Sequence, residues 1–570
     1  MRGRNGHSNI REGFTLKRTI TLLLVVAMMI GLVMPVASAD YAADEVVTLQ
    51  MFSMPSNTSG LQESYYWTDI LAQKVGVAIE LLPSGDQGEQ QLAKLMAANE
   101  LPDVVVLKEY KHVVDAIAAD LLLCLDDYQT ELNDAFTNIP TAIQYFRDNV
   151  SNGTGKAYAF PNDVAAVSQT TGDTDFGPFL RWDLYKEIGM PVINTFEDLL
   201  PVLQQMLEIY PVNEDGQKVY GFSLWTDWDN ISMQSAGDFY AYYGHGQFGF
   251  LDVDYATNEF SSIFAEDGLY KRWLQLLFDA NQLGLVDPDS LSQRWNDYLD
   301  KHTAGRALYS NWSWGFGNYN TPERVEAGIG FQPVYVQDVK IERGSGPNYI
   351  GSAWPYAISK NTQNLDAALR FVNWMYSHDG LWLMEYGEQG IYWDVDADGP
   401  YKTEFGFKMD ADPTLEFDNG GRASNGISVI NSAGMSGRAV NPTYGYTRSA
   451  LDWQKKDFAP ADTALVADWK ETMGIYDGTI AYLKSKDMMI EKDFAPQEPD
   501  SDEVTQINTR IGDVCKTNSW LMVFAKDQAE FDALWADMVD KAEGMNVQAS
   551  LDATIANYKN GLEFGSKYMN

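Results

Sequence analysis

Cysteine is almost absent from this chain. Cys124 and Cys515 are the only two among 570 residues, which excludes the disulfide framework of small secreted domains. The two thiols could form a single disulfide in an oxidising compartment. Because so little cysteine provides no framework, we predict two free thiols that are buried in the folded protein.

Long apolar runs are missing beyond residue 36, so no later segment could span a membrane. The N-terminus is different. Residues 1–18 hold five basic side chains against one acid, residues 20–36 are largely apolar, and Ala37-Ser38-Ala39 follows. This order is typical of a secretory signal peptide, and we predict a signal peptide over residues 1–39 with cleavage before Asp40. A retained membrane anchor is the alternative, because the apolar run approaches the ~20 residues that span a bilayer.

Basic residues are also few. The chain has 41 Lys and Arg against 80 Asp and Glu, and cleavage of the basic N-terminal segment would make it more acidic. Such a surface repels phosphate backbones, so nucleic acid is not an expected partner. The simplest role of this charge is to keep an exported protein in solution.

Motifs of catalysis and metal binding are missing or incomplete. The five histidines show no metal-ligand spacing, and no G-x-S-x-G elbow is present. Residues 244–249 fit G-x-G-x-x-G, but neither the strand before it nor the helix after it that a dinucleotide site needs is predicted. Asp394, Asp396 and Asp398 begin like a calcium loop whose twelfth position is Phe405 instead of Glu. We therefore expect no catalytic residue, metal or cofactor, and an acidic turn between two strands at 394–399.

Strand and helix patterns alternate in the first part of the chain. Strand-like runs at 46–52, 78–82 and 101–107 are separated by helix-like stretches at 61–75 and 87–98. This alternation predicts an α/β fold with a parallel sheet covered by helices. Ligands bind at the carboxyl ends of such strands, which makes Ser53, Asn57, Lys108 and Glu109 candidate site residues.

Tryptophan is abundant, with 16 residues. Two predicted strands, at 219–224 and 307–310, run directly into Trp225, Trp228, Trp312 and Trp314. Indole rings can cover the flat C–H faces of sugars, and their N–H can bond a hydroxyl. Asp227, between the first two rings, could accept bonds from sugar hydroxyls. Each of these rings could instead pack in the core between sheet and helix.

A third predicted strand, at 179–183, also ends at a tryptophan, Trp182, which lies beside Arg181. The donors of Arg181 suit vicinal hydroxyls or a uronate carboxylate, and a salt bridge to a neighbouring acid is the alternative. A helix follows at 184–188 and should end at Gly189. Thr195 and Asp198 then form a predicted capping box at the next helix.

Six segments, in order, resemble extracellular solute-binding proteins of ABC importers, the large sugar-binding class (family 1), and most closely its LipO-like branch. They are Glu89–Val106, Lys156–Pro161, Leu180–Leu199, Gly305–Trp314, Ile358–Trp393 and Trp535–Tyr558. The resemblance covers nearly all of the predicted mature chain. Two features depart from the family. Asp40 stands where the lipidated cysteine would be, and residues 213–218 keep only two carboxylates of the calcium loop that some relatives carry.

The resemblance implies a two-lobed, periplasmic-binding-protein-like fold. We expect residues 45–150 plus 312–356 in one lobe, 151–311 plus 357–510 in the other, crossing hinge segments near 150, 310 and 356, and C-terminal helices over 511–570 packed on the body. Trp354 and Tyr356 precede the place where the family crosses between lobes, so both join the candidate ligand-binding residues.

The function that the resemblance implies is capture of a carbohydrate, an oligosaccharide, in the cleft between the lobes, outside the cytoplasmic membrane. The partners would be the membrane permease subunits of an ABC importer, and the protein would be a monomer without a lipid anchor. A secreted carbohydrate-active enzyme is one alternative, because 80 acidic residues leave room for a catalytic carboxylate pair. A peptide-binding transport protein is the other.

Overall fold

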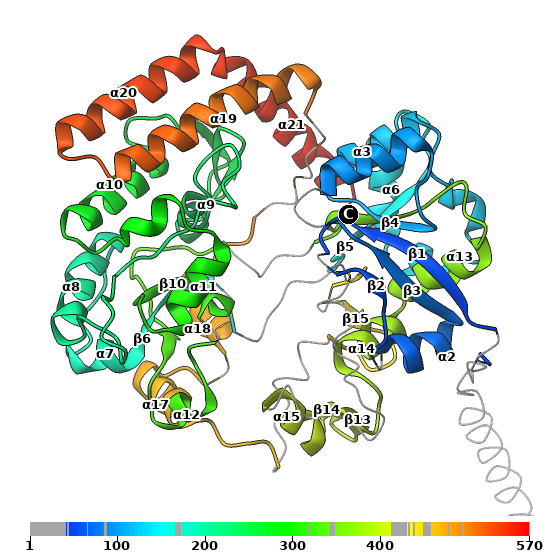
Figure 1. Ribbon diagram of the computed structural model, residues 1–570, viewed down its shortest axis with the longest axis horizontal. Helices are drawn as coiled ribbons and strands as arrows, with labels where there is room; N and C mark the ends of the chain where they lie inside the picture. Colours follow the sequence, from blue (N-terminus) through cyan, green and yellow to red (C-terminus); the bar gives the residue numbers. More distant parts are fainter. Residues whose placement is uncertain are drawn as a thin grey trace, which may run out of the picture.

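The computed structural model describes residues 41–568, except 43–44, 57, 65, 85–87, 166–172, 175, 317, 343–347, 412–429, 431–433, 437–438, 448–457, 477, 493–494, 496–497 and 499. Two lobes are evident, each with its own sheets and helices (Figure 1). The α/β class and the two-lobed fold predicted from the sequence are confirmed.

A six-stranded sheet forms the centre of the first lobe. Its strand order is β2 (Gly60–Leu61), β3 (Val77–Leu82), β1 (Val47–Ser53), β4 (Val104–Val106), β12 (Ser352–Ile358) and β5 (Ala159–Asn162). β1 runs parallel to β3 and β4, whereas β12 runs antiparallel to β4. The three strands predicted for this part of the chain are therefore present and adjacent.

Helices cover both faces of this sheet, which explains why its central strands are apolar on both sides. In β4, Val104 and Val106 point into one core cluster and Val105 into the other, as the two-residue period of a strand requires. α3 (Gly88–Ala98) and α4 (Tyr110–Ala118) cover one face, and α2 (Ala72–Val75), α5 (Asn133–Asn138), α13 (Leu365–Met375) and α14 (His378–Tyr386) the other. α6 (Pro140–Asn149) contributes side chains to both clusters.

Shorter elements complete the first lobe. A hairpin of β13 (Trp393–Asp396) and β14 (Gly399–Lys402) is followed by α15 (Glu404–Ala411), and β15 (Val440–Asn441) pairs with β16 (Tyr446–Thr447). The predicted acidic turn at 394–399 is confirmed as the β13–β14 turn. Within the described part of the chain, no group of three or more His, Cys, Asp or Glu side chains could hold a metal ion.

The second lobe is built on an antiparallel sheet with β6 (Phe176–Arg181) between β10 (Tyr309–Trp312) and β11 (Phe331–Pro333). A separate meander of β7 (His245–Phe248), β8 (Leu251–Asp254) and β9 (Glu259–Ser262) shares the core of this lobe. Its helices are α7 (Trp182–Glu187), α8 (Leu199–Ile209), α9 (Gln234–Tyr242), α10 (Leu269–Gln282), α11 (Trp295–Thr303), α12 (Pro322–Glu326), α17 (Ala464–Met473) and α18 (Thr479–Ser485).

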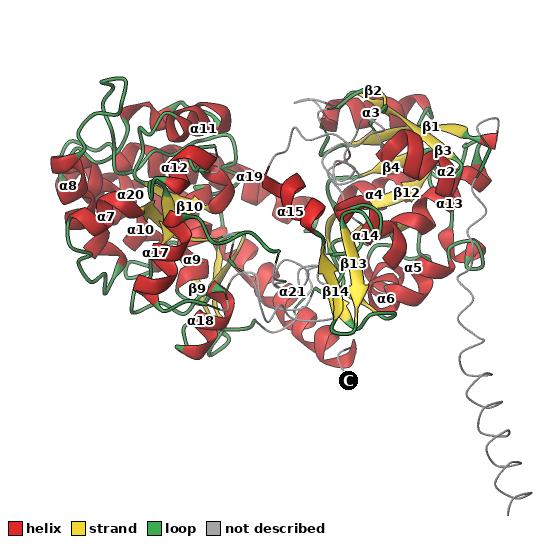
Figure 2. Ribbon diagram, turned by 90° about the horizontal axis from the view of Figure 1, so that it is seen from below, coloured by secondary structure: helices red, strands yellow, loops and turns green. Residues whose placement is uncertain are grey.

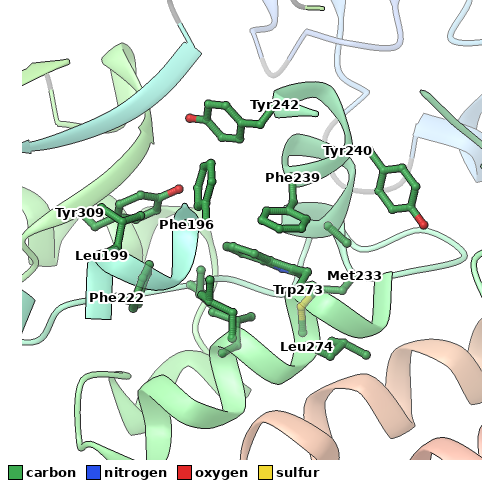
Figure 3. Close-up of a cluster of buried hydrophobic side chains, with 14 of the residues drawn as sticks. Phe196, Leu199, Phe222, Met233, Phe239, Tyr240, Tyr242, Trp273, Leu274 and Tyr309 are labelled. Atoms are coloured by element: carbon green, nitrogen blue, oxygen red, sulfur yellow. The ribbon is translucent and has the colours of Figure 1, made fainter. Parts of the chain in front are cut away.

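Local signals for α7 and α8 are confirmed. Gly189, just beyond α7, has a φ of 86°, a left-handed conformation that favours glycine. Thr195 and Asp198 form both bonds of the predicted capping box ahead of α8. The core that these helices enclose is aromatic: the rings of Phe196 and Phe239 are 5.2 Å apart, and Phe239 lies 5.0 Å from Trp273 (Figure 3).

Three long helices end the chain: α19 (Asp502–Val523), α20 (Gln528–Gly544) and α21 (Val547–Tyr568). Their buried side chains, such as Ile511 and Trp535, belong to the core of the second lobe. α21 then reaches the first lobe, where Phe564 packs edge-on against Tyr145 at 5.3 Å (Figures 1 and 2). Among the described residues, none of the helices has the length and apolar character needed to cross a membrane.

The division of the chain between the lobes differs from the expected one. Residues 312–341 pack in the second core, not the first, because β10 and β11 both pair with β6. Residues 357–411 pack in the first core, because β12 pairs with β4 and brings α13 and α14 with it. The chain therefore changes lobe at about 165–176, 342–348 and 447–462 instead of near 150, 310 and 356.

Cys124 and Cys515 are free thiols and lie in different lobes. Cys515 is buried, and Cys124 is partly buried.

Candidate ligand-binding site

Five tryptophans of the second lobe form one continuous aromatic group, which we call the tryptophan surface: Trp225, Trp228, Trp295, Trp312 and Trp314. Trp228 stacks on Trp295 with ring centroids 4.7 Å apart and an interplanar angle of 23°. Trp314 lies 5.0 Å from Trp295 and 5.1 Å from Trp312. α11, which begins at Trp295, is on the side of the second lobe that is turned toward the first (Figures 1 and 2).

Two members of this surface are open to solvent. Trp228 and Trp314 are 40% and 42% exposed, whereas Trp225 and Trp312 are only 6% exposed. The buried pair supports the exposed pair, since Trp225 lies edge-on to Trp228 at 5.2 Å. An exposed ring held rigidly by other rings offers a flat apolar face to a ligand without a large loss of side-chain entropy.

Two carboxylates hold the loop that carries Trp225 and Trp228. Asp227 accepts hydrogen bonds from the backbone N–H of Trp295 at 3.1 and 3.2 Å, which places it at the start of α11. Asp229 accepts bonds from the indole Nε1 of Trp520 at 2.6 Å and from the backbone N–H of Gln234 at 2.8 Å. Burial raises the pKa of the Asp229 carboxyl to about 6, although these two donors oppose the shift.

A cavity of about 650 Å³ lies between the lobes, and we call it the interlobe cavity. The first lobe contributes Glu109 and Lys111, from the carboxyl end of β4 and the start of α4. The second lobe contributes Asn230, two residues after Trp228, and α19 adds Asn508. Its volume lies within the range of ligand pockets in proteins.

Three of the first-lobe candidates lie at the carboxyl edge of the six-stranded sheet. Lys108 and Glu109 are exposed directly after β4, and Glu109 lines the interlobe cavity. Trp354 is partly buried at a bulge of β12, where its φ of 67° is unusual for a residue with a large side chain. Ser53 is buried and donates its hydroxyl to the carbonyl of Ile430. Asn57 lies outside the described residues.

Tyr356 and Arg181 occupy structural positions. Tyr356 is fully buried in the first core, between the rings of Phe371 and Tyr376, because its position in β12 points it away from the lobe surface. Its assignment to the ligand site is therefore corrected.

Arg181 is 3% exposed and makes two hydrogen bonds with Asp183, at 2.9 and 2.7 Å. Its guanidinium also lies 4.6 Å from the ring centre of Tyr319. This is the salt-bridge role considered from the sequence, and these contacts correct the assignment of Arg181 to hydroxyl binding.

Trp295 is the site residue that sequence reasoning missed. It opens α11, and Tyr298 and His302 follow on the same helical face. The ring of Trp295 stacks on Tyr298 at 4.9 Å and an angle of 24°. This aromatic spacing, three and four residues apart, was the available signal, but it does not distinguish a core stripe from a surface. Only the approach of α11 to the 225–228 loop makes Trp295 part of the site.

Comparison with known proteins is consistent with this architecture. A family model described as bacterial extracellular solute-binding protein matches residues 58–382, more than half of the chain. No curated protein is similar enough in sequence to be matched. Among solved structures, the S. pneumoniae ABC-transporter substrate-binding protein FusA, an EF-hand mutant in complex with fructo-nystose, has a TM-score of 0.63 at 15% identity, covering 90% of this chain and 99% of that one.

Two further structures have the same overall arrangement. An HMO-binding, ABC-transporter-associated solute-binding protein from Bifidobacterium longum infantis has a TM-score of 0.58 at 16% identity, covering 90% of this chain and 98% of that one. The alginate-binding protein AlgQ2 without calcium ion has a TM-score of 0.58 at 14% identity, covering 92% and 100%. These identities show a shared fold only. Because the family model spans most of both lobes, the chain belongs to the bacterial extracellular solute-binding protein family.

Proposed function

We propose that this protein captures a carbohydrate, an oligosaccharide, between its two lobes outside the cytoplasmic membrane and delivers it to the permease subunits of an ABC importer. The observation that carries the proposal is the tryptophan surface, in which Trp228 and Trp314 present open ring faces. Sugars are the ligand class that combines flat C–H faces with a dense edge of hydroxyls, and indole rings match those faces.

Polar groups beside the rings fit the hydroxyl edge of a sugar. Asp227 is exposed next to Trp228 and keeps acceptor capacity beyond the two bonds from the backbone of Trp295. Across the interlobe cavity, Glu109 and Lys111 offer further acceptors and donors, whereas the amide of Asn508 is already bonded to Asp500 and Ser550. The structural relatives include an alginate-binding protein, an HMO-binding protein and a protein in complex with fructo-nystose, and these ligands support a sugar over a peptide.

Binding would favour the closed arrangement of the lobes. A ligand that contacts both the tryptophan surface of the second lobe and Glu109 of the first lobe makes all of its contacts only when the lobes approach each other. The permease subunits would then distinguish the closed form from the open one. The signal peptide over residues 1–39, a monomeric state and the absence of catalysis are parts of the same proposal.

A thermal-shift screen with neutral and acidic oligosaccharides tests the proposal, because a ligand that binds only the folded protein raises its melting temperature. Short peptides form a second arm of the screen. Any sugar that binds is then incubated with the protein, and reducing ends are measured. Stabilisation by a sugar without release of reducing ends is the expected result. Stabilisation by peptides alone, or release of reducing ends, would replace the proposal with one of its two alternatives.

A further inference from the structure

A second cavity, of about 570 Å³, lies at the carboxyl end of β10, next to the tryptophan surface. Ser313 lines it and stands between Trp312 and Trp314 in the chain. Because Trp314 belongs to the tryptophan surface and its neighbour Ser313 to the cavity wall, the two sites adjoin. We call this second site the phenylalanine cavity.

Aromatic rings form one side of its wall. Phe316 and Phe331 stack with centroids 4.8 Å apart and an angle of 19°, and Phe179 lies 5.0 Å from Phe316. Trp469 completes this side, with its indole N–H already donated to the carbonyl of Pro333 at 2.9 Å. These rings are fixed by one another and present apolar faces to the cavity.

Polar groups are distributed among the rings. Asp173 accepts a hydrogen bond from the backbone N–H of Thr479 at 3.0 Å, and burial raises the pKa of its carboxyl. Lys470 pairs with Asp462 at 2.8 Å, so its charge is compensated. The side chain of Gln332 adds an amide to the lining. An amide, a buried carboxyl and a charge-compensated ion pair between ring faces suit the hydroxyls and C–H faces of a pyranose or furanose unit better than a free anion or an alkyl chain.

Both lobes and two of the segments that join them contribute to this wall. Phe407 comes from α15, whose Met409 is buried in the first core, whereas Phe179 and Phe331 belong to the second lobe. Asp173 and Asp462 lie at the second-lobe ends of two crossing segments. An occupant would therefore contact both lobes and respond to the angle between them.

We propose that the phenylalanine cavity is a subsite for one end of the same oligosaccharide that lies on the tryptophan surface, so that the protein selects ligands long enough to reach both. This inference rests on the proposed function and adds chain length to it. A short sugar would occupy the tryptophan surface alone, and only a longer one would also contact Phe407.

The test is isothermal titration with disaccharide-to-hexasaccharide series of malto-, manno-, xylo- and fructo-oligosaccharides. Two variants alter the cavity: Phe407→Ala removes the first-lobe wall, and Val466→Trp fills the cavity from α17. Phe405→Ala is the matched control, because Phe405 lies on the same helix and packs against the first core instead of lining the cavity. Melting temperatures are recorded for all variants, to show that each is folded.

We expect the wild-type affinity to rise with chain length in the series that binds. Phe407→Ala and Val466→Trp should weaken binding of the longest members roughly 5- to 50-fold, the effect of losing the burial of one aromatic face, and leave the shortest binding member unchanged. Phe405→Ala should alter neither. If both cavity variants bind long and short sugars as the wild type does, or weaken both equally, the subsite is refuted and the proposed function stands. If no sugar binds the wild type, the proposed function fails and the subsite with it.

Discussion

Replacing Trp228 by alanine should weaken sugar binding by an amount that follows from its exposure. A tryptophan side chain buries up to about 250 Å², and Trp228 is 40% exposed, so about 100 Å² remains for a ligand to cover. At about 25 cal/mol per Å², full coverage contributes about 2.5 kcal/mol, and coverage of one ring face about half of that. The expected loss of about 1–2.5 kcal/mol corresponds to an affinity roughly 5- to 70-fold lower.

Trp312 provides the matched comparison inside the same aromatic group. It is only 6% exposed and packs against Phe176 at 5.3 Å, so Trp312→Ala should chiefly cost about 3–5 kcal/mol of unfolding free energy. Titration calorimetry with the sugar found in the screen measures affinity, and urea unfolding followed by fluorescence measures stability. Trp228→Ala should therefore chiefly lower the affinity for the sugar, and Trp312→Ala should chiefly lower the unfolding free energy.

Trp314→Ala extends the comparison, because Trp314 is exposed to the same degree as Trp228. Should Trp228→Ala and Trp314→Ala both bind the sugar as tightly as the wild type does, the tryptophan surface is not the binding site. Its rings would then serve stability only, and the ligand would have to be sought elsewhere between the lobes.

Three further predictions concern charge and export. Burial raises the pKa of Asp229 to about 6, so the folded protein keeps this proton to higher pH than the unfolded chain, and its contribution to stability is lost as the pH rises from about 4 through 6. Asp229→Asn should remove that dependence. The unfolding free energy of the wild type, relative to that of the variant, should therefore fall by about 1–3 kcal/mol between about pH 4 and pH 6. If the two proteins show the same dependence of unfolding free energy on pH, this reasoning is wrong. Arg181→Lys should lower stability by about 1–3 kcal/mol, because one of the two bonds to Asp183 is lost, and leave sugar affinity unchanged in calorimetry. Protein secreted by its own host should begin at Asp40 and carry no acyl chain, which N-terminal sequencing and mass spectrometry can check.

Local elements were predictable from the sequence because their signals are local. The apolar runs that became β1, β3 and β4, the capping box of Thr195 and Asp198, and the acidic β13–β14 turn each depend on a few neighbouring residues. The alternation of strands and helices was sufficient for the fold class. Trp312 and Trp314 lie at the end of β10, as predicted, whereas the strand predicted before Trp225 and Trp228 forms only isolated bridges at Tyr220 and Phe222.

The division between lobes was not predictable in this way. β12 lies some 250 residues after β4 in the chain and inserts antiparallel beside it, and no local pattern identifies that partner. Trp295 likewise joins the site only because α11 packs against the loop that carries Trp225 and Trp228. Arg181 is a similar case for a single side chain. Its guanidinium could bind sugar hydroxyls or form a salt bridge, and only the position of Asp183 in the folded protein decides for the salt bridge.

The last helix makes the C-terminus useful as a sensor of lobe motion. Tyr558 of α21 is buried in the core of the second lobe, and Phe564 of the same helix packs against Tyr145 of the first lobe. Any change in the angle between the lobes must therefore slide or release this contact. A fluorophore attached at Glu563, beside the contact, would report opening and closing directly, without labels in either sugar site. The same contact couples the two lobes mechanically.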